Sequence, residues 1–176
     1  MIMVMVVKIC VVYYSRTGNT AHVVEVLKNA FSSIGADVDV YRVSPVREYS
    51  KPLHINPRVI YDTLVRKGTD IDFDPEKPML ERYSAILIAS PIWIGRLAPP
   101  IQEFLKSCTA LVKHLVIITT SAMSTECRKI EKSIEESWRL KPMLCINITT
   151  AMIKDSTGLR RLIHDIAKKL VEISKR

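Results

Sequence analysis

The segment from Ser15 to Thr20 reads SRTGNT and combines three hydroxyl side chains, an asparagine and a glycine within six residues. An apolar run (residues 4–13) precedes it, and a helical pattern of apolar residues follows it. The first turn of a helix presents free backbone N–H groups and about half a positive charge, which together stabilise an anion such as a phosphate. We therefore predict a phosphate-binding loop, with a turn that only caps its helix as the alternative.

The same loop lacks two common nucleotide-binding patterns. It has no lysine at the position required by G-x-x-x-x-G-K-[ST], and it does not have the glycine spacing of G-x-G-x-x-G. Neither a nucleoside triphosphate site nor a dinucleotide site is indicated. A terminal monophosphate fits the loop better, because Gly18 lets the backbone approach the ligand closely and the side chains of the loop can add hydrogen bonds.

Five apolar segments alternate with helical patterns, which predicts an α/β fold with a parallel sheet and right-handed crossovers. The expected strands are residues 4–13, 36–43, 83–90, 111–121 and 142–153, and the expected helices run from Gly18 to Ser33, from Pro99, from Thr125 to Leu140 and from Thr157 to Ser174. Ser124 or Thr125 is the expected cap of the third helix. In such sheets ligands bind at the carboxyl ends of the strands. The loops after the first, third and fourth strands are therefore the candidate site.

The composition indicates one folded domain. The chain has 176 residues, of which 48% are hydrophobic and 25% are charged, and this excludes a disordered protein. The initial run MIMVMVV is too short for a membrane span and lacks a basic segment before it. The four cysteines show no C-x-x-C pair, and the histidines show no ligand spacing. We expect reduced thiols in a cytoplasmic protein and no metal site.

Two motifs carry a family resemblance. YYSRTGNT resembles the phosphate-binding loop of flavodoxins, where a strand ending in aromatic residues leads into T/S-x-T-G-N-T. ASPIWIGRLAPPIQEFL is similar to a segment of short flavodoxin-like proteins, G-[ST]-P-x-W-x-G-x-x-P-P-x-x-x-F-L. The matching residues of the second motif are Ser90, Pro91, Trp93, Gly95, Pro99, Pro100, Phe104 and Leu105. The resemblance extends over essentially the whole chain and is weakest in residues 44–82.

The resemblance implies a flavodoxin-like three-layer α/β/α sandwich in which a five-stranded parallel sheet has the order 2-1-3-4-5. It implies a single domain over residues 1–176, with residues 44–82 as a variable insertion, and FMN as the cofactor. The residues themselves show no Ser/His/Asp or Cys/His arrangement and no histidine ligand spacing, so we expect no catalytic side chain and no metal ligand. The implied cofactor-binding residues are Ser15, Arg16, Thr17, Gly18, Asn19 and Thr20, then Ser90, Pro91, Ile92, Trp93, Ile94 and Gly95, and finally Ser121, Ala122 and Met123.

Trp93 is the expected aromatic wall beside the flavin ring, because a large flat π-system needs such a surface. The third loop departs from the family pattern, since Ser121–Met123 offers neither a tyrosine nor a glycine-rich turn. One flavin face is therefore open, or it is covered by Met123, by residues 44–82 or by a second copy of the chain. Arg16 either strengthens phosphate binding or points to solvent.

The charge is uneven. The chain carries a formal charge of +8, of which +7 falls in residues 89–176. An acidic redox partner such as a ferredoxin would complement this half. An electron carrier is the leading interpretation, and the alternative is an NAD(P)H-dependent FMN oxidoreductase of the quinone or flavin reductase type. A basic nucleic-acid-binding domain is a third alternative, although no basic segment interleaved with aromatic residues supports it.

Overall fold

The apolar, β-branched segments form the strands of one central sheet in the computed structural model, which describes residues 6–108, 112 and 114–175. The strands are β1 (Lys8–Tyr13), β2 (Asp37–Pro45), β3 (Ile71–Asp74), β4 (Ala85–Trp93), β5 (Arg96–Leu97), β6 (Leu115–Ser121) and β7 (Leu144–Thr149). The α-helices are α1 (Asn19–Ser33), α2 (Pro57–Tyr61), α3 (Pro99–Ser107), α4 (Cys127–Trp138), α5 (Thr150–Lys154) and α6 (Ser156–Ser174). The predicted strand residues 4, 5, 111 and 113 lie outside the described part of the chain.

Five strands pair in parallel in the order β2-β1-β4-β6-β7. Counted along the chain as the five predicted strands, this is the expected order 2-1-3-4-5. The sequence does not indicate two antiparallel additions, β3 beside β2 and the two-residue β5 beside β4. β5 has only two residues, and the alternation IDFD of β3 covers only four residues within a polar, proline-rich segment.

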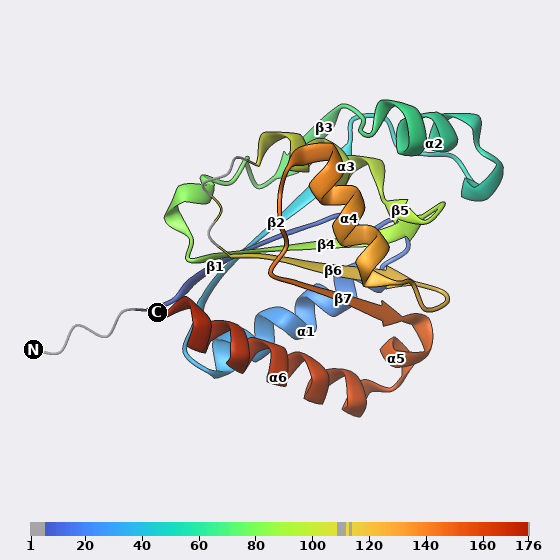
Figure 1. Ribbon diagram of the computed structural model, residues 1–176. Coiled ribbons are helices and arrows are strands. Elements are labelled where there is room, and N and C mark those ends of the chain that lie inside the picture. The colour runs from blue at the N-terminus through green and yellow to red at the C-terminus, as the bar shows by residue number, and fades with distance from the viewer. Residues whose placement is uncertain (1–5, 109–111, 113, 176) are drawn as a thin grey trace, which may run out of the picture.

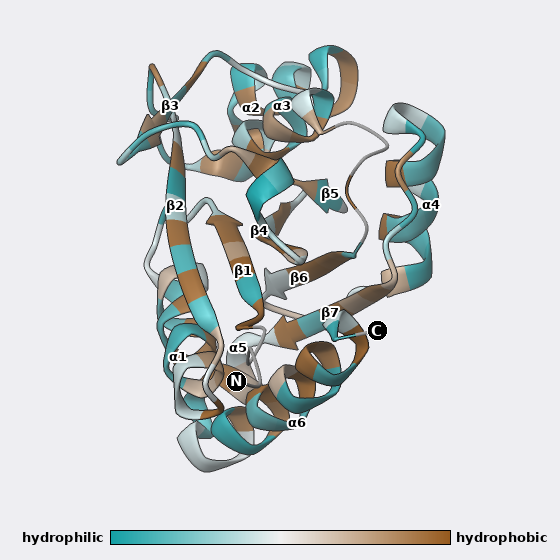
Figure 2. Ribbon diagram, turned by 90° about the vertical axis from the view of Figure 1, so that its left-hand side faces the viewer, coloured by the Kyte–Doolittle hydropathy of each residue, from teal (hydrophilic) through white to brown (hydrophobic). Residues whose placement is uncertain are grey.

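Alternate residues of each central strand face opposite layers of helices. Ile9 and Val11 of β1 pack in a core with α1 and α6, whereas Cys10 and Val12 pack in a second core with α3 and α4. Figure 1 shows α1 and α6 on one side of the sheet and α3 and α4 on the other. Figure 2 shows that α4 is apolar where it faces the sheet and polar on its outer side. The three-layer α/β/α architecture follows from this two-sided burial. The helices that the structure describes are each too short or too polar to cross a membrane.

The end of the fifth strand and the start of α4 differ from the prediction. The fifth strand ends at Thr149, because the Thr149 hydroxyl accepts the N–H of Met152 (3.3 Å) and starts α5 within the predicted strand. Helix α4 begins at Cys127 rather than Thr125, and no side chain caps it. The backbone N–H of Thr125 is bonded instead to Asn147 Oδ1 (3.0 Å), which keeps Thr125 outside the helix.

Residues 44–82 connect β2 to β4 and lie beside α3 and β5, with β3 paired to β2. This segment contains 3-10 turns at Leu53–Ile55 and Leu80–Arg82, helix α2, a π-helical turn at Asp62–Arg66 and strand β3. Asn56 caps α2, since its Oδ1 accepts the N–H groups of Arg58 (2.9 Å) and Val59 (3.4 Å). The sequence PRVIYDTLVRKG (residues 57–68) predicts one short helix within this segment, and α2 confirms it.

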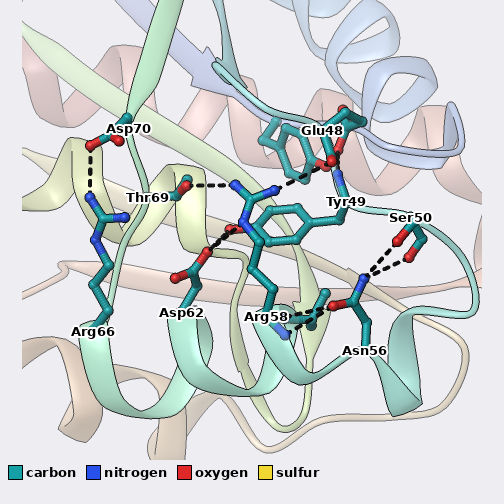
Figure 3. A network of polar contacts seen from close by, with 11 residues as sticks. Glu48, Tyr49, Ser50, Asn56, Arg58, Asp62, Arg66, Thr69 and Asp70 are labelled. Carbon is teal, nitrogen blue, oxygen red and sulfur yellow. Dashed lines mark hydrogen bonds and ion pairs between the residues drawn. The ribbon is translucent and has the colours of Figure 1, made fainter.

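A polar network inside this segment includes a buried carboxylate (Figure 3). Asp62 is 3% exposed; it accepts the hydroxyl of Tyr49 (2.7 Å) and pairs with Arg58 (3.4 Å). The Arg58 guanidinium lies 4.3 Å from the centre of the Tyr49 ring. Burial raises the pKa of the Tyr49 phenol, so that this group remains a donor at neutral pH. These contacts order the segment between β2 and β3.

We predict that Asp62→Ala lowers the free energy of unfolding by about 2 kcal/mol. Removing one partner of a fully buried ion pair costs about 3–5 kcal/mol, and Arg58 is partly exposed, which lowers the cost. Asp70→Ala is the matched control, because it removes an exposed pair with Arg66 (2.7 Å) in the same segment and should cost about 0.5 kcal/mol or less. Urea unfolding measures both values, and equal losses would contradict the prediction.

Candidate functional site

The first loop connects β1 to α1 and ends in a left-handed residue. Gly18 has a φ of +96° and occupies the N-cap of α1. Its N–H donates to Ser15 Oγ (3.1 Å), which shapes the turn. Thr17, Gly18 and Asn19 are exposed. The first turn of α1 has no side-chain cap and no acidic residue, so its backbone N–H groups remain open to an anion.

A buried hydrogen bond joins this loop to the end of β6. The hydroxyl groups of Thr20 and Thr120 lie 2.7 Å apart, and the two residues are only 1% and 4% exposed. Thr20 therefore faces the interior rather than the open side of the loop. Its role is to fix the start of α1 against the sheet.

Arg16 faces the 44–82 segment. Its Nε lies 3.6 Å from Glu48 Oε1, and its Nη2 donates to the backbone oxygen of Tyr49 (3.3 Å). Glu48 also accepts the hydroxyl of Tyr14 (2.9 Å). Burial is the largest cause that raises the pKa of the Tyr14 hydroxyl, and the hydrogen bond to Glu48 is the second largest. The guanidinium of Arg16 thus pairs with the carboxylate of Glu48. The side chain of Arg16 therefore lies at the side of the first loop, next to the 44–82 segment.

The second loop is a tight hairpin between β4 and β5. Its two central residues, Ile94 and Gly95, have φ values of +52° and +71°, as a type I′ turn requires. Ser90 is fully buried beneath the hairpin, where its Oγ accepts the N–H of Ala98 (3.0 Å) and donates to the backbone oxygen of Pro91 (2.9 Å). The exposed part of this motif is therefore the tip of the hairpin, Ile94 and Gly95, whereas Ser90 is buried at the base of the hairpin.

Trp93 lies between the first loop and the 44–82 segment. Tyr14 and Tyr49 each place their ring centre 5.5 Å from that of Trp93, at interplanar angles of 82° and 89°. Such edge-on contacts hold the indole in a fixed orientation. A mostly apolar cavity of about 180 Å³ adjoins Trp93 and is lined by Leu53, His54, Val59, Ile92, Trp93 and Ile94. The 44–82 segment is therefore part of the wall around Trp93.

The third loop is held by an asparagine from β7. Asn147 Nδ2 donates to Ser121 Oγ (2.8 Å), and Ser121 Oγ donates to the backbone oxygen of Met123 (2.6 Å). Ala122 and Met123 are exposed, Met123 to 80%. The loop thus offers backbone groups and one flexible apolar side chain, and no aromatic ring.

The structure brings the three predicted loops to one edge of the sheet, because β1, β4 and β6 are parallel neighbours. Sequence reasoning missed several residues that shape this edge: Glu48, Tyr49, Thr120 and Asn147. Asn147 has a recognisable signal, since it is an amide inside the apolar run LCINIT. Glu48 and Tyr49 have none, because their contacts depend on how the 44–82 segment folds back.

Several solved flavoprotein structures superpose with this chain over most of its length. A flavoprotein from Lactobacillus acidophilus, solved in complex with FMN, superposes with a TM-score of 0.61 at 21% identity, covering 80% of this chain and 92% of that one. Flavodoxin 1 from Bacillus cereus superposes with a TM-score of 0.57 at 14% identity, covering 94% and 97%. The chain has the flavodoxin-like fold. A candidate flavoprotein from Bacteroides uniformis aligns with a TM-score of 0.71 at 18% identity, covering 93% and 99%.

The flavodoxin-like fold is thus evident from structure at low sequence identity. No protein-family model matches the sequence. No curated protein matches it either. The alignments with the Bacteroides uniformis and Bacillus cereus structures cover nearly the whole of both chains.

We predict that Thr20→Val and Thr120→Val each lower the free energy of unfolding by about 1–2 kcal/mol, because each leaves the other hydroxyl buried without its partner. The double variant should lose less than the sum of the two single losses, since it removes both hydroxyls and keeps the shape. Urea unfolding of the three variants measures this coupling. Strict additivity would show that the bond does not hold the loop to β6.

Proposed function

We propose that this protein binds FMN and carries electrons between redox partners. The observation that carries the proposal is the open first turn of α1, where a left-handed Gly18 precedes backbone N–H groups that no side chain caps. A phosphate is stabilised by such groups and by the positive end of the helix. The Lactobacillus acidophilus structure, solved in complex with FMN, supports this choice of ligand.

The residues present fit that cofactor. Thr17 and Asn19 supply exposed hydroxyl and amide groups beside the open turn, whose shape the buried Ser15 holds through its bond to the Gly18 N–H. Trp93 supplies an aromatic surface that Tyr14 and Tyr49 hold in place. The hairpin tip and the third loop add backbone groups around the same edge. When bound, FMN supplies one- and two-electron transfer, and the protein supplies binding, orientation and exclusion of water.

The charge of the chain suits an acidic redox partner. The excess of +7 in residues 89–176 would attract an acidic protein of the ferredoxin class and raise the rate of association at low salt. The four free thiols fit a reducing compartment, and we place the protein in the cytoplasm.

We predict that Gly18→Ala weakens FMN binding at least about tenfold, or about 1.4 kcal/mol. A Cβ at Gly18 meets no atom within 4 Å, so its effects are a strained backbone and a bulkier approach to the phosphate. Gly35→Ala is the matched control: its φ is +78°, and its Cβ also meets no atom within 4 Å, but it lies at the other end of α1. Each should cost about 1–2 kcal/mol of stability.

Fluorescence titration of FMN measures the affinities, and urea unfolding measures the stabilities. The expected result is a loss of affinity for Gly18→Ala alone. Equal affinities in the two variants would refute the phosphate site.

A second function, an NAD(P)H-dependent FMN oxidoreductase, is favoured by the third loop. Met123 is 80% exposed and no aromatic residue lies between Ser121 and Glu126, so a nicotinamide could reach a flavin seated beside this loop. Addition of NADPH or NADH to the flavin-loaded protein without oxygen separates the two functions. We predict that the carrier keeps its absorbance near 450 nm for minutes, whereas bleaching within seconds would establish the reductase.

A further inference from the structure

Two cysteines meet beside the third loop. Cys127 is the first residue of α4, and Cys145 lies in β7, on the sheet face that α4 covers. The side chains of Cys127 and Cys145 are close enough that each affects the pKa of the other, and the backbone of Asn147 also affects the pKa of Cys127. Two residues before Cys127, the Thr125 N–H is bonded to Asn147 Oδ1 (3.0 Å). The start of α4 is therefore held against β7 next to the two cysteines.

The environment of this pair differs from that of the other two cysteines. Cys127 and Cys145 are partly exposed, whereas Cys10 and Cys108 are 0% and 7% exposed inside the second core. Burial raises the pKa of all four thiols. For Cys127 the contact with Cys145 lowers the pKa, the charge of Glu131 raises it further, and the backbone of Asn147 lowers it. The uncapped first turn of α4 also favours a thiolate. Cys127 is thus the thiol best placed to react first.

We propose that Cys127 and Cys145 are a dithiol pair that closes reversibly to a disulfide and fastens the third loop to β7. The oxidant is a low-molecular-weight disulfide such as oxidised glutathione. Cys127 loses its proton and attacks one sulfur of this disulfide, which forms a mixed disulfide and releases one glutathione thiolate. Cys145 then loses its proton and attacks the sulfur of Cys127, which releases the second glutathione. The protein loses two electrons and two protons, and the oxidant becomes two thiols.

A disulfide between Cys127 and Cys145 restrains the third loop because this loop ends at Cys127. The loop begins at Ser121, at the end of β6, and ends at Cys127. In the dithiol form, hydrogen bonds from Asn147 to Ser121 and Thr125 hold it to β7. A covalent link at Cys127 adds a contact that local opening cannot break. This inference does not rest on flavin binding.

The test counts thiols in the full chain after equilibration at increasing ratios of oxidised to reduced glutathione. Samples are quenched in acid, unfolded, alkylated with N-ethylmaleimide and weighed as intact protein. All four cysteines should be alkylated in the reduced protein and only two in the oxidised protein, with Cys127 and Cys145 joined in the peptide map. Four alkylated thiols at every ratio, or a bond between other cysteines, would overturn the proposal.

Two serine variants sharpen the result. Cys145→Ser should trap Cys127 as a mixed glutathione disulfide, whereas Cys108→Ser is the matched control and should still lose two thiols on oxidation. Hydrogen exchange of peptides covering residues 121–126 then tests the restraint. Exchange should slow at least about threefold in the oxidised protein and remain unchanged in oxidised Cys145→Ser. Equal exchange in oxidised and reduced wild-type protein would overturn the fastening of the loop.

Discussion

Parallel pairing of β1, β4 and β6 is the constraint on which the rest of the structure depends. Because these strands run in the same direction as neighbours, their carboxyl ends and the loops that follow them meet at one edge of the sheet. No single loop forms the candidate site, since the first offers backbone N–H groups, the second an indole and the third exposed backbone. The Thr20–Thr120 hydrogen bond fixes the first turn of α1 against the end of β6.

The 44–82 segment takes part in the same arrangement. Tyr49 contacts Trp93 through its ring and Asp62 through its hydroxyl, so it links the indole to the polar network inside the segment. Glu48 similarly links Tyr14 and Arg16. The segment is therefore a structural support for the site and more than a surface insertion.

Much of the fold could be predicted from the sequence, because its signals are local. Continuous apolar runs mark buried parallel strands, and apolar residues at helical spacing mark α1 and α6. The exposed part of the first loop was predictable for the same reason, since Thr17, Gly18 and Asn19 lie within one short motif. Long-range contacts were not predictable in this way. The partners of Arg16 lie more than thirty residues away, and the side chains of Thr20 and Ser90 face the interior. The order of residue types in a motif does not show which of its side chains are exposed.

The position of Trp93 has a practical consequence. The chain has two tryptophans, and the other, Trp138, is the last residue of α4 and packs against the second core. With phenylalanine at position 138, the ultraviolet emission of the protein would come from one indole, whose surroundings include the 44–82 segment and the first loop. Such a single-tryptophan protein would report optically on this one corner of the molecule without any attached dye.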